Sequence, residues 1–225
     1  MKISNKLRIA AVLLGLAASS QAAAAVKLND VFNASMLGKQ LRYFESVAGI
    51  TQEIRGTEHY FMVAGCEVVA DVAQDTVVGL SLAVSPKCPA NLTSFLGESF
   101  APDPRKPLTF GRFAEAASPT MEFHADCLTS CGNAYDPGVQ AYWEGPRALN
   151  FIQVRLEVLL VEEPALTASS QWSDGMTRQR GEDYVLDTRF NCERSFDDMA
   201  LTAFKDVPVT RVTIGQGLLS GVQCN

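Results

Sequence analysis

The clearest pattern in the chain is an alternation of apolar and polar residues between Phe151 and Val161. A period of two is typical of a strand that buries one face of a sheet and exposes the other. We therefore predict a strand in this segment. The apolar positions of the alternation are Ile152, Val154, Leu156, Val158 and Leu160.

Two earlier runs, His59 to Asp71 and Thr76 to Val84, are rich in β-branched and apolar residues and are separated by only four residues. Such runs around a short polar break are typical of an antiparallel hairpin. By the same composition, further strands are predicted at Thr120 to Cys127, Val139 to Trp143, Tyr184 to Asn191 and Val207 to Ile214.

Helical spacing of apolar residues predicts a helix from Val31 to Ala48, with Gly49 as its stop. Thr109 is a candidate N-cap for a short helix from Phe110 to Ala117. Two more helices are predicted at Ala165 to Arg180 and Phe196 to Lys205, and Ser195 with Asp198 resembles a capping box for the second.

Because helices and strands alternate along the chain, we expect an α+β fold with helices packed on an antiparallel sheet, in two helix-and-hairpin units. The segment from Pro86 to Pro107 is rich in Pro, Ser, Lys and Asp, so it is the candidate boundary. The two units would then span residues 26–88 and 108–225.

The first unit contains Leu37-Gly38-Lys39 in its helix, Val47-Ala48-Gly49 at the helix end, and a returning strand Thr76-Val77-Val78-Gly79-Leu80. This order of helix, strand, tight turn and strand resembles the unit of β-lactamase-inhibitor-protein-like domains. The resemblance covers residues 31–86 and, more faintly, 109–162. It implies an exported protein with two such units, a protein partner and no chemistry, and it identifies no individual binding residue.

Residues 1–25 have the three parts of a secretory signal peptide: a charged start, an apolar stretch from Ile9 to Ala18, and an end of small residues. A stretch of about ten apolar residues is too short to span a bilayer, which needs about 20. We therefore expect a periplasmic or secreted mature protein of residues 26–225, without stable membrane insertion.

The charge of the chain is acidic. Its 19 basic and 25 acidic residues give a net charge of -6, and loss of Lys2, Lys6 and Arg8 with the leader leaves 16 against 25, or -9. This balance argues against a nucleic-acid ligand, which favours a basic surface. Solubility explains the acidity in general, and a basic protein partner would explain it more specifically.

All six cysteines lie after the leader, and an even number in an oxidising compartment predicts a disulfide framework. Six cysteines allow 15 pairings. The simplest scheme joins neighbours along the chain: Cys66 with Cys88, Cys127 with Cys131, and Cys192 with Cys224.

Candidate chemistry is weak. Glu122, His124, Asp126, Cys127 and Cys131 are of metal-ligating types, but alternation along a strand would direct His124 and Cys127 to opposite faces, and a bridge would consume both thiolates. No nucleophile motif or phosphate loop accompanies them. The sequence therefore predicts no cofactor and favours a non-enzymatic, protein-binding or inhibitor-like protein. The alternative is an envelope hydrolase or redox enzyme with an unrecognised site around Glu122, His124 and Cys127.

The segment from Tyr142 to Arg147 is the predicted partner-binding turn, since it combines Tyr, Trp and Arg, the residue types enriched at interface hot spots. Val139, Ala141 and Trp143 share one face of the predicted strand, so we expect Trp143 in the core. Tyr142 and Arg147 are then the expected exposed contacts.

The leader generates the first prediction. Processing should occur between Gln21 and Val26, because the small residues that a signal peptidase requires lie there. Mass spectrometry of the mature N-terminus, after fractionation of the producing cell, measures this. Recovery of the protein in the membrane fraction with Met1 intact would contradict the prediction.

Overall fold

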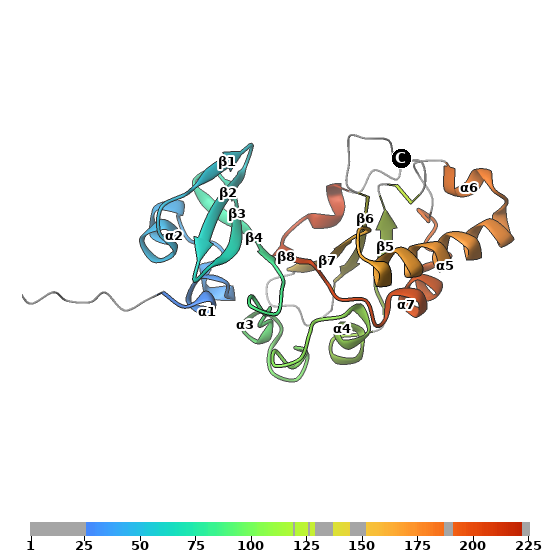
Figure 1. The fold of residues 1–225 in the computed structure, drawn as a ribbon. Coiled ribbons are helices and arrows are strands. Elements are labelled where there is room, and N and C mark those ends of the chain that lie inside the picture. The colour runs from blue at the N-terminus through green and yellow to red at the C-terminus, as the bar shows by residue number, and fades with distance from the viewer. Residues whose placement is uncertain are drawn as a thin grey trace, which may run out of the picture.

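The computed structural model describes residues 26–118, 120–125, 127–128, 137–144, 152–186 and 191–221. Among these residues, eight strands form one sheet in the order β1-β2-β3-β4-β8-β7-β6-β5, and all neighbours are antiparallel (Figure 1). The predicted α+β class is confirmed. The strands are β1 (Glu53–Arg55), β2 (Glu58–Val63), β3 (Cys66–Ala73), β4 (Thr76–Ala83), β5 (Glu122–Ala125), β6 (Gly138–Trp143), β7 (Gln153–Leu159) and β8 (Arg211–Gly215).

The helices lie mainly at the start of the chain and after β7, with α3 and α4 between β4 and β5. They are α1 (Leu28–Val31), η1 (Ala34–Met36), α2 (Leu41–Ala48), α3 (Thr93–Leu96), α4 (Phe110–Ala116), α5 (Glu163–Arg180), α6 (Asp183–Leu186), α7 (Asp197–Phe204) and η3 (Leu218–Gly221). Thr109 caps α4 as predicted, since its hydroxyl accepts a hydrogen bond from the backbone N–H of Arg112.

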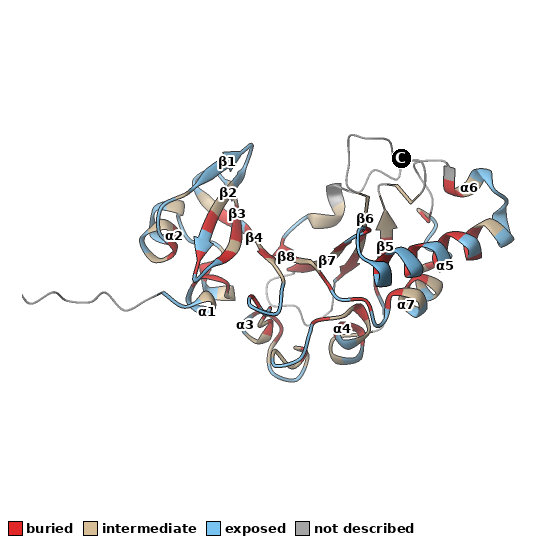
Figure 2. Cartoon of the chain, viewed as in Figure 1, coloured by how far each residue is buried: buried red, intermediate tan, exposed pale blue. Residues whose placement is uncertain are grey.

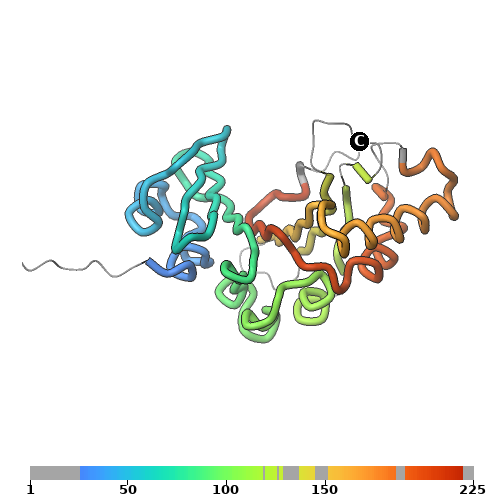
Figure 3. Tube along the Cα trace, viewed as in Figure 1, coloured from blue at the N-terminus to red at the C-terminus, as the bar shows by residue number. Residues whose placement is uncertain are grey.

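The last strand joins the two parts of the sheet. β8 pairs with β4 on one side and with β7 on the other, so the C-terminal segment lies beside the N-terminal strands (Figure 3). Residues before 88 and after 108 thus contribute to one continuous sheet. Their division into two units stays a prediction.

One face of the sheet is apolar across seven strands. Its central row runs by direct cross-strand pairing, and every member is buried (Figure 2). This row forms the core of the protein, because burial of apolar surface is the dominant favourable contribution to folding. It comprises Phe61, Val68, Leu82, Val212, Leu156, Ala141 and Phe123.

Four helices cover this apolar face through aromatic contacts with the row. The ring of Phe44 in α2 lies 4.9 Å from that of Phe61, in an edge-to-face arrangement. At the other end of the row, α4, α5 and α7 place rings around Phe123. These are Phe110 at 5.8 Å, Trp172 at 6.3 Å and Phe204 at 6.4 Å between centroids.

The predicted continuous helix from Val31 to Ala48 is wrong, because the segment contains α1, η1 and α2 instead. Gly38 has a φ of 78°, which ends the helical path. Its backbone N–H donates a hydrogen bond of 2.8 Å to the carbonyl of Val77, and Leu41 N–H donates to Asp75. Backbone N–H groups that a continuous helix would satisfy internally are therefore satisfied by Val77 of β4 and by Asp75 in the turn before it.

The predicted single strand from His59 to Asp71 is two strands, β2 and β3, joined by Ala64 and Gly65. Both turn residues have positive φ, 51° and 81°, as a tight type I′ hairpin requires. Gln74 and Asp75, at 49° and 60°, make the same kind of turn between β3 and β4. The turn at Gln74 and Asp75 lies in the predicted hairpin break, whereas Ala64 concealed the first turn from sequence rules based on Gly and Asn.

The predicted bridge between Cys66 and Cys88 is confirmed and joins the first residue of β3 to the loop after β4. A loop of this length contributes about 3 kcal/mol of stability in the chain-entropy account. Cys127 and Cys192 are also disulfide-bonded. Cys131 and Cys224 lie outside the described residues, so the other two predicted pairs stay predictions.

The longest helix, α5, begins with Pro164 in its first turn and ends at Gly181, whose φ is 91°. Trp172 and Met176 are fully buried on one side, while most of the opposite side is exposed. Neither α5 nor any other helix in the described part of the chain is long and apolar enough to cross a membrane.

Close packing between α4 and the end of α7 generates the second prediction. A Cβ on Gly111 would lie 2.6 Å from the backbone oxygen of Lys205, which accepts the Gly111 N–H. Gly111→Ala should therefore lower the free energy of unfolding by about 1–3 kcal/mol, despite the better helix propensity of alanine. Urea denaturation measures the change.

The matched control is Ser170→Ala, at an exposed position of α5, which should change stability by less than about 0.5 kcal/mol. Equal stability of Gly111→Ala and the wild type would show that α4 and α7 do not approach this closely.

Candidate functional site

The second face of the sheet is polar, and its N-terminal part carries exposed side chains. In β2 and β3 the residues that alternate with the buried row are directed to this polar face. We call six of its residues the sheet-face patch. The patch comprises Glu58, Tyr60 and Met62 of β2, Glu67 and Asp71 of β3, and Arg211 of β8.

Tyr60 is held by charged groups on two sides. Its hydroxyl donates a hydrogen bond of 2.7 Å to the Glu58 carboxylate, and the Arg55 guanidinium lies 4.9 Å from the ring centroid. The bond to Glu58, followed by partial burial, raises the pKa of Tyr60 above its ordinary value of 10.0. The phenol is therefore a protonated, positioned group at neutral pH.

Arg211 and Glu67 form an ion pair of 2.8 Å that connects β8 to β3 across β4. The small side chain of Ala83, opposite Arg211 in β4, leaves room for this contact. Both members are partly exposed, at 34% and 38%, so the pair contributes little to stability. Its main effect is to hold a guanidinium and a carboxylate in fixed positions on the surface.

A shallow hollow of about 200 Å³ lies at this part of the polar face. Arg, Tyr and Met, which are enriched in the buried parts of protein interfaces, line it together with carboxylates. The Met62 side chain is 48% exposed beside it. The lining residues are Gln52, Glu53, Arg55, Tyr60, Phe61, Met62, Glu67 and Arg211.

The patch is acidic. Glu58, Glu67 and Asp71 supply three carboxylates and Arg211 supplies one guanidinium, so the formal charge is -2 (3 against 1). Glu58 and Asp71 are direct cross-strand partners, an arrangement that is unfavourable for two like charges. A cation placed between them would relieve this repulsion.

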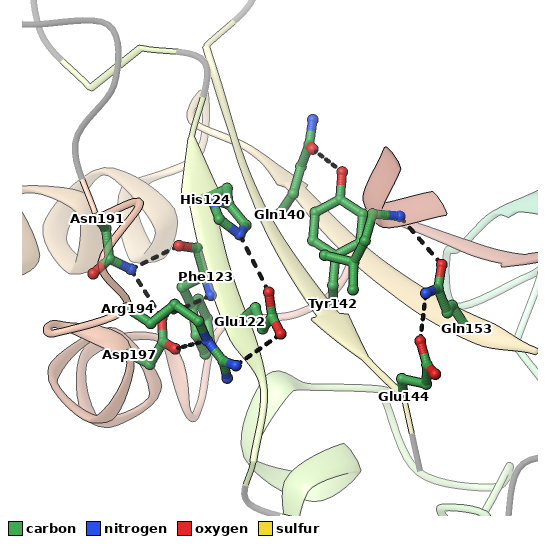
Figure 4. A network of polar contacts seen from close by, with 11 residues as sticks. Glu122, Phe123, His124, Gln140, Tyr142, Glu144, Gln153, Asn191, Arg194 and Asp197 are labelled. Atoms are coloured by element: carbon green, nitrogen blue, oxygen red, sulfur yellow. Dashed lines mark hydrogen bonds and ion pairs between the residues drawn. The ribbon is translucent and has the colours of Figure 1, made fainter. Parts of the chain in front are cut away.

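At the opposite edge of the sheet, side chains satisfy the backbone of β5 (Figure 4). Phe123 N–H donates a hydrogen bond of 3.0 Å to Asp197, and the Asn191 amide donates one of 2.7 Å to the Phe123 carbonyl. The Asn191 side-chain amide also donates a hydrogen bond to the Asp197 carboxylate, and its carbonyl oxygen accepts one from the backbone N–H of Phe196. Two side chains thus occupy the positions that another strand would take.

Asn191 makes these bonds from a left-handed backbone conformation, with φ at 58°, and is fully buried. The predicted strand from Tyr184 to Asn191 is wrong at both of its described ends, because Tyr184 lies in α6 (Asp183–Leu186) and Asn191 lies in a turn, while residues 187–190 lie outside the described residues. The predicted capping box of Ser195 and Asp198 is also wrong, because α7 has Phe196 as its N-cap, without a side-chain capping bond.

Glu122 and His124 lie on the polar face of β5, as alternation predicted. The Glu122 carboxylate forms an ion pair of 2.8 Å with the Arg194 guanidinium. His124 Nε2 lies 3.9 Å from the same carboxylate (Figure 4). Burial lowers the pKa of His124 below its ordinary value of 6.5, although Glu122 opposes this. The stability contributed by neutral His124 is therefore present above pH 6.5 and declines as the pH falls below it.

The structure describes only part of the metal or redox site considered from the sequence. Cys127 is disulfide-bonded, so it offers no thiolate. Within the described ranges, no three His, Cys, Asp or Glu residues are close enough to hold a metal ion. Asp126 and Cys131 lie outside those ranges.

The predicted exposure of Tyr142 is wrong. Its side chain is only 3% exposed, and its hydroxyl donates a hydrogen bond of 2.6 Å to Gln140. It lies on the polar face between His124 and Arg155, so that both faces of β6 are buried here. Trp143 lies in the core as predicted, and Arg147 is outside the described residues.

Sequence reasoning missed Tyr60, Met62 and Arg211 as surface candidates. Their alternation with Phe61 and Val63 could have identified the first two. The pairing of Arg211 with Glu67 could not be predicted, because 144 residues separate them.

Comparison of the chain with models of protein families, with curated proteins and with solved structures found no match. The resemblance to β-lactamase-inhibitor-protein-like domains stays a prediction.

The network at β5 generates the third prediction. Asn191→Gly tolerates the positive φ but removes the bonds to Phe123 and Phe196, which leaves buried backbone groups unsatisfied. The free energy of unfolding should fall by about 1–3 kcal/mol. Chemical denaturation measures this, and amide exchange at Phe123 locates it.

Asn191→Ala should be at least as destabilising, because alanine adds the cost of a left-handed backbone. A glycine variant as stable as the wild type would show that the side-chain bonds do not hold the edge.

Proposed function

We propose that the chain is an exported, non-enzymatic binding protein, of the inhibitor kind, that docks a basic protein partner on the sheet-face patch. The observation that carries this proposal is the surface combination of Tyr60, Met62 and Arg211 with an excess of carboxylates. Tyr, Met and Arg are interface residue types, and the negative charge favours a positively charged partner surface.

The rigidity of this part of the sheet supports the proposal. The patch residues come from β2, β3 and β8, and they are positioned by cross-strand pairing and not by a loop. The Cys66–Cys88 bridge fixes the beginning of β3. A surface ordered before binding loses little conformational entropy when a partner docks.

A protein partner fits this surface better than a nucleic acid. Phosphates would be repelled by Glu58 and Asp71, whereas a lysine or arginine would neutralise their unfavourable pairing. Periplasmic or secreted localisation is part of the same proposal. It rests on the leader pattern and on the disulfides, which persist in oxidising compartments.

Site-specific photo-crosslinking in the producing cell tests the docking face and is the fourth prediction. A photoreactive phenylalanine analogue at Met62 should form a protein adduct, because this side chain is exposed within the patch. The matched position is Leu166 of α5, where the exposure is 43% against 48% at Met62. An adduct at Met62 that is absent at Leu166 is the expected result.

Charge reversal then tests the chemistry of the partner. Glu58→Lys with Asp71→Lys should weaken binding of the cross-linked protein at least tenfold at low salt, because close opposite charges become like charges. Glu98→Lys with Asp206→Lys changes the net charge equally at exposed positions elsewhere and should have little effect. Equal weakening by both pairs, or no adduct at Met62, would reject the proposal.

A further inference from the structure

The two edge strands of the sheet differ in whether their outward-facing backbone groups have hydrogen-bond partners. At β5, the Phe123 N–H and carbonyl are bonded by Asp197 and Asn191. At β1, no strand among the described residues pairs with the outer edge. Unpaired sheet edges are templates for another strand, and most proteins protect them.

Exposed apolar side chains lie in β1 and shortly before it in the sequence. Ile50, just before β1, is 91% exposed, and Ile54, at the centre of β1, is 60% exposed. Exposed aliphatic side chains in and near an open edge are unfavourable in water and favour a covered state.

The sequence of β1, Glu53-Ile54-Arg55, is complementary to a second copy of itself in antiparallel orientation. We propose that β1 pairs antiparallel with β1 of a second copy of this chain, around a two-fold axis at Ile54. In this register Ile54 lies opposite Ile54 of the second copy. Glu53 lies opposite Arg55 of the second copy, and Arg55 lies opposite its Glu53, so both flanking pairs have opposite charge.

The monomer already contains the groups that this pairing needs. Arg55 forms two hydrogen bonds to Glu53 within β1, at 2.7 and 2.9 Å, and both side chains are more than half exposed. In the dimer the same guanidinium and carboxylate exchange partners across the axis. No charge is left unpaired or buried in the exchange.

A two-fold pairing also closes the assembly. In the part of the chain that the structure describes, each copy offers one open edge, since Asn191 and Asp197 bond the backbone of Phe123 at the β5 edge. An isologous contact of this kind gives dimers and not fibres. A three-residue strand buries far less than the roughly 1,200 Å² of a stable interface, so association should be weak and should increase with protein concentration.

The dimer does not depend on the proposed partner. Edge-to-edge pairing leaves the polar face uncovered, and the patch residue Asp71 lies on β3, which pairs with β2 and β4 and not with β1. Asp71→Lys alone should therefore weaken partner binding and leave self-association unchanged, which separates failure of one proposal from failure of the other.

The fifth prediction is that the purified protein dimerises with increasing concentration, which sedimentation velocity over a hundredfold concentration range measures. The weight-average mass of the wild type should rise towards twice that of the monomer. Glu53→Arg alone and Arg55→Glu alone should stay monomeric, because each places like charges opposite one another. Circular dichroism checks that both variants are folded.

The decisive sample is an equimolar mixture of the two single variants. Arginines on one chain then face glutamates on the other, so a heterodimer should form where neither variant associates alone. The double exchange E53R/R55E should associate like the wild type. A monomeric wild type, single variants that associate normally, or a mixture that stays monomeric would each overturn the proposal.

Discussion

The fold depends on the position of β8 between β4 and β7. This strand forms one hydrogen-bonded ladder with the N-terminal strands and another with the C-terminal ones. Through it the buried row continues from Leu82 to Leu156, with Val212 between them. The same strand carries Arg211 to the polar face, where it meets Glu67. The core and the candidate surface therefore share one structural requirement.

The two faces of the sheet show how alternation separates core side chains from surface side chains. In β2, Phe61 packs under the ring of Phe44, while its neighbours Tyr60 and Met62 are directed to the polar face. Substitutions on the polar face of β2 can therefore alter the surface without altering the core. On the same face of the sheet, the partly exposed ion pair of Arg211 with Glu67 contributes little to stability.

Local patterns predicted the elements that depend on neighbouring residues. The alternation around Leu156 and the cap at Thr109 are examples, because a strand face and a helix start are determined within a few positions. Features that depend on distant residues were not predictable. Gly38 interrupts a helical pattern to bond with Val77, Tyr142 is covered on a face expected to be exposed, and Asn191 is recruited to a distant strand.

The late place of β8 in the sequence also determines when the sheet can be completed. Ala83 and its partner Arg211 are 128 residues apart (211 minus 83), so this ladder closes a very long loop. Closing a long loop costs conformational entropy before the strand contacts that compensate this cost can form, so topologies with long-range strand pairing fold slowly. The N-terminal strand β4 therefore cannot pair with β8 until almost the entire chain has been synthesised.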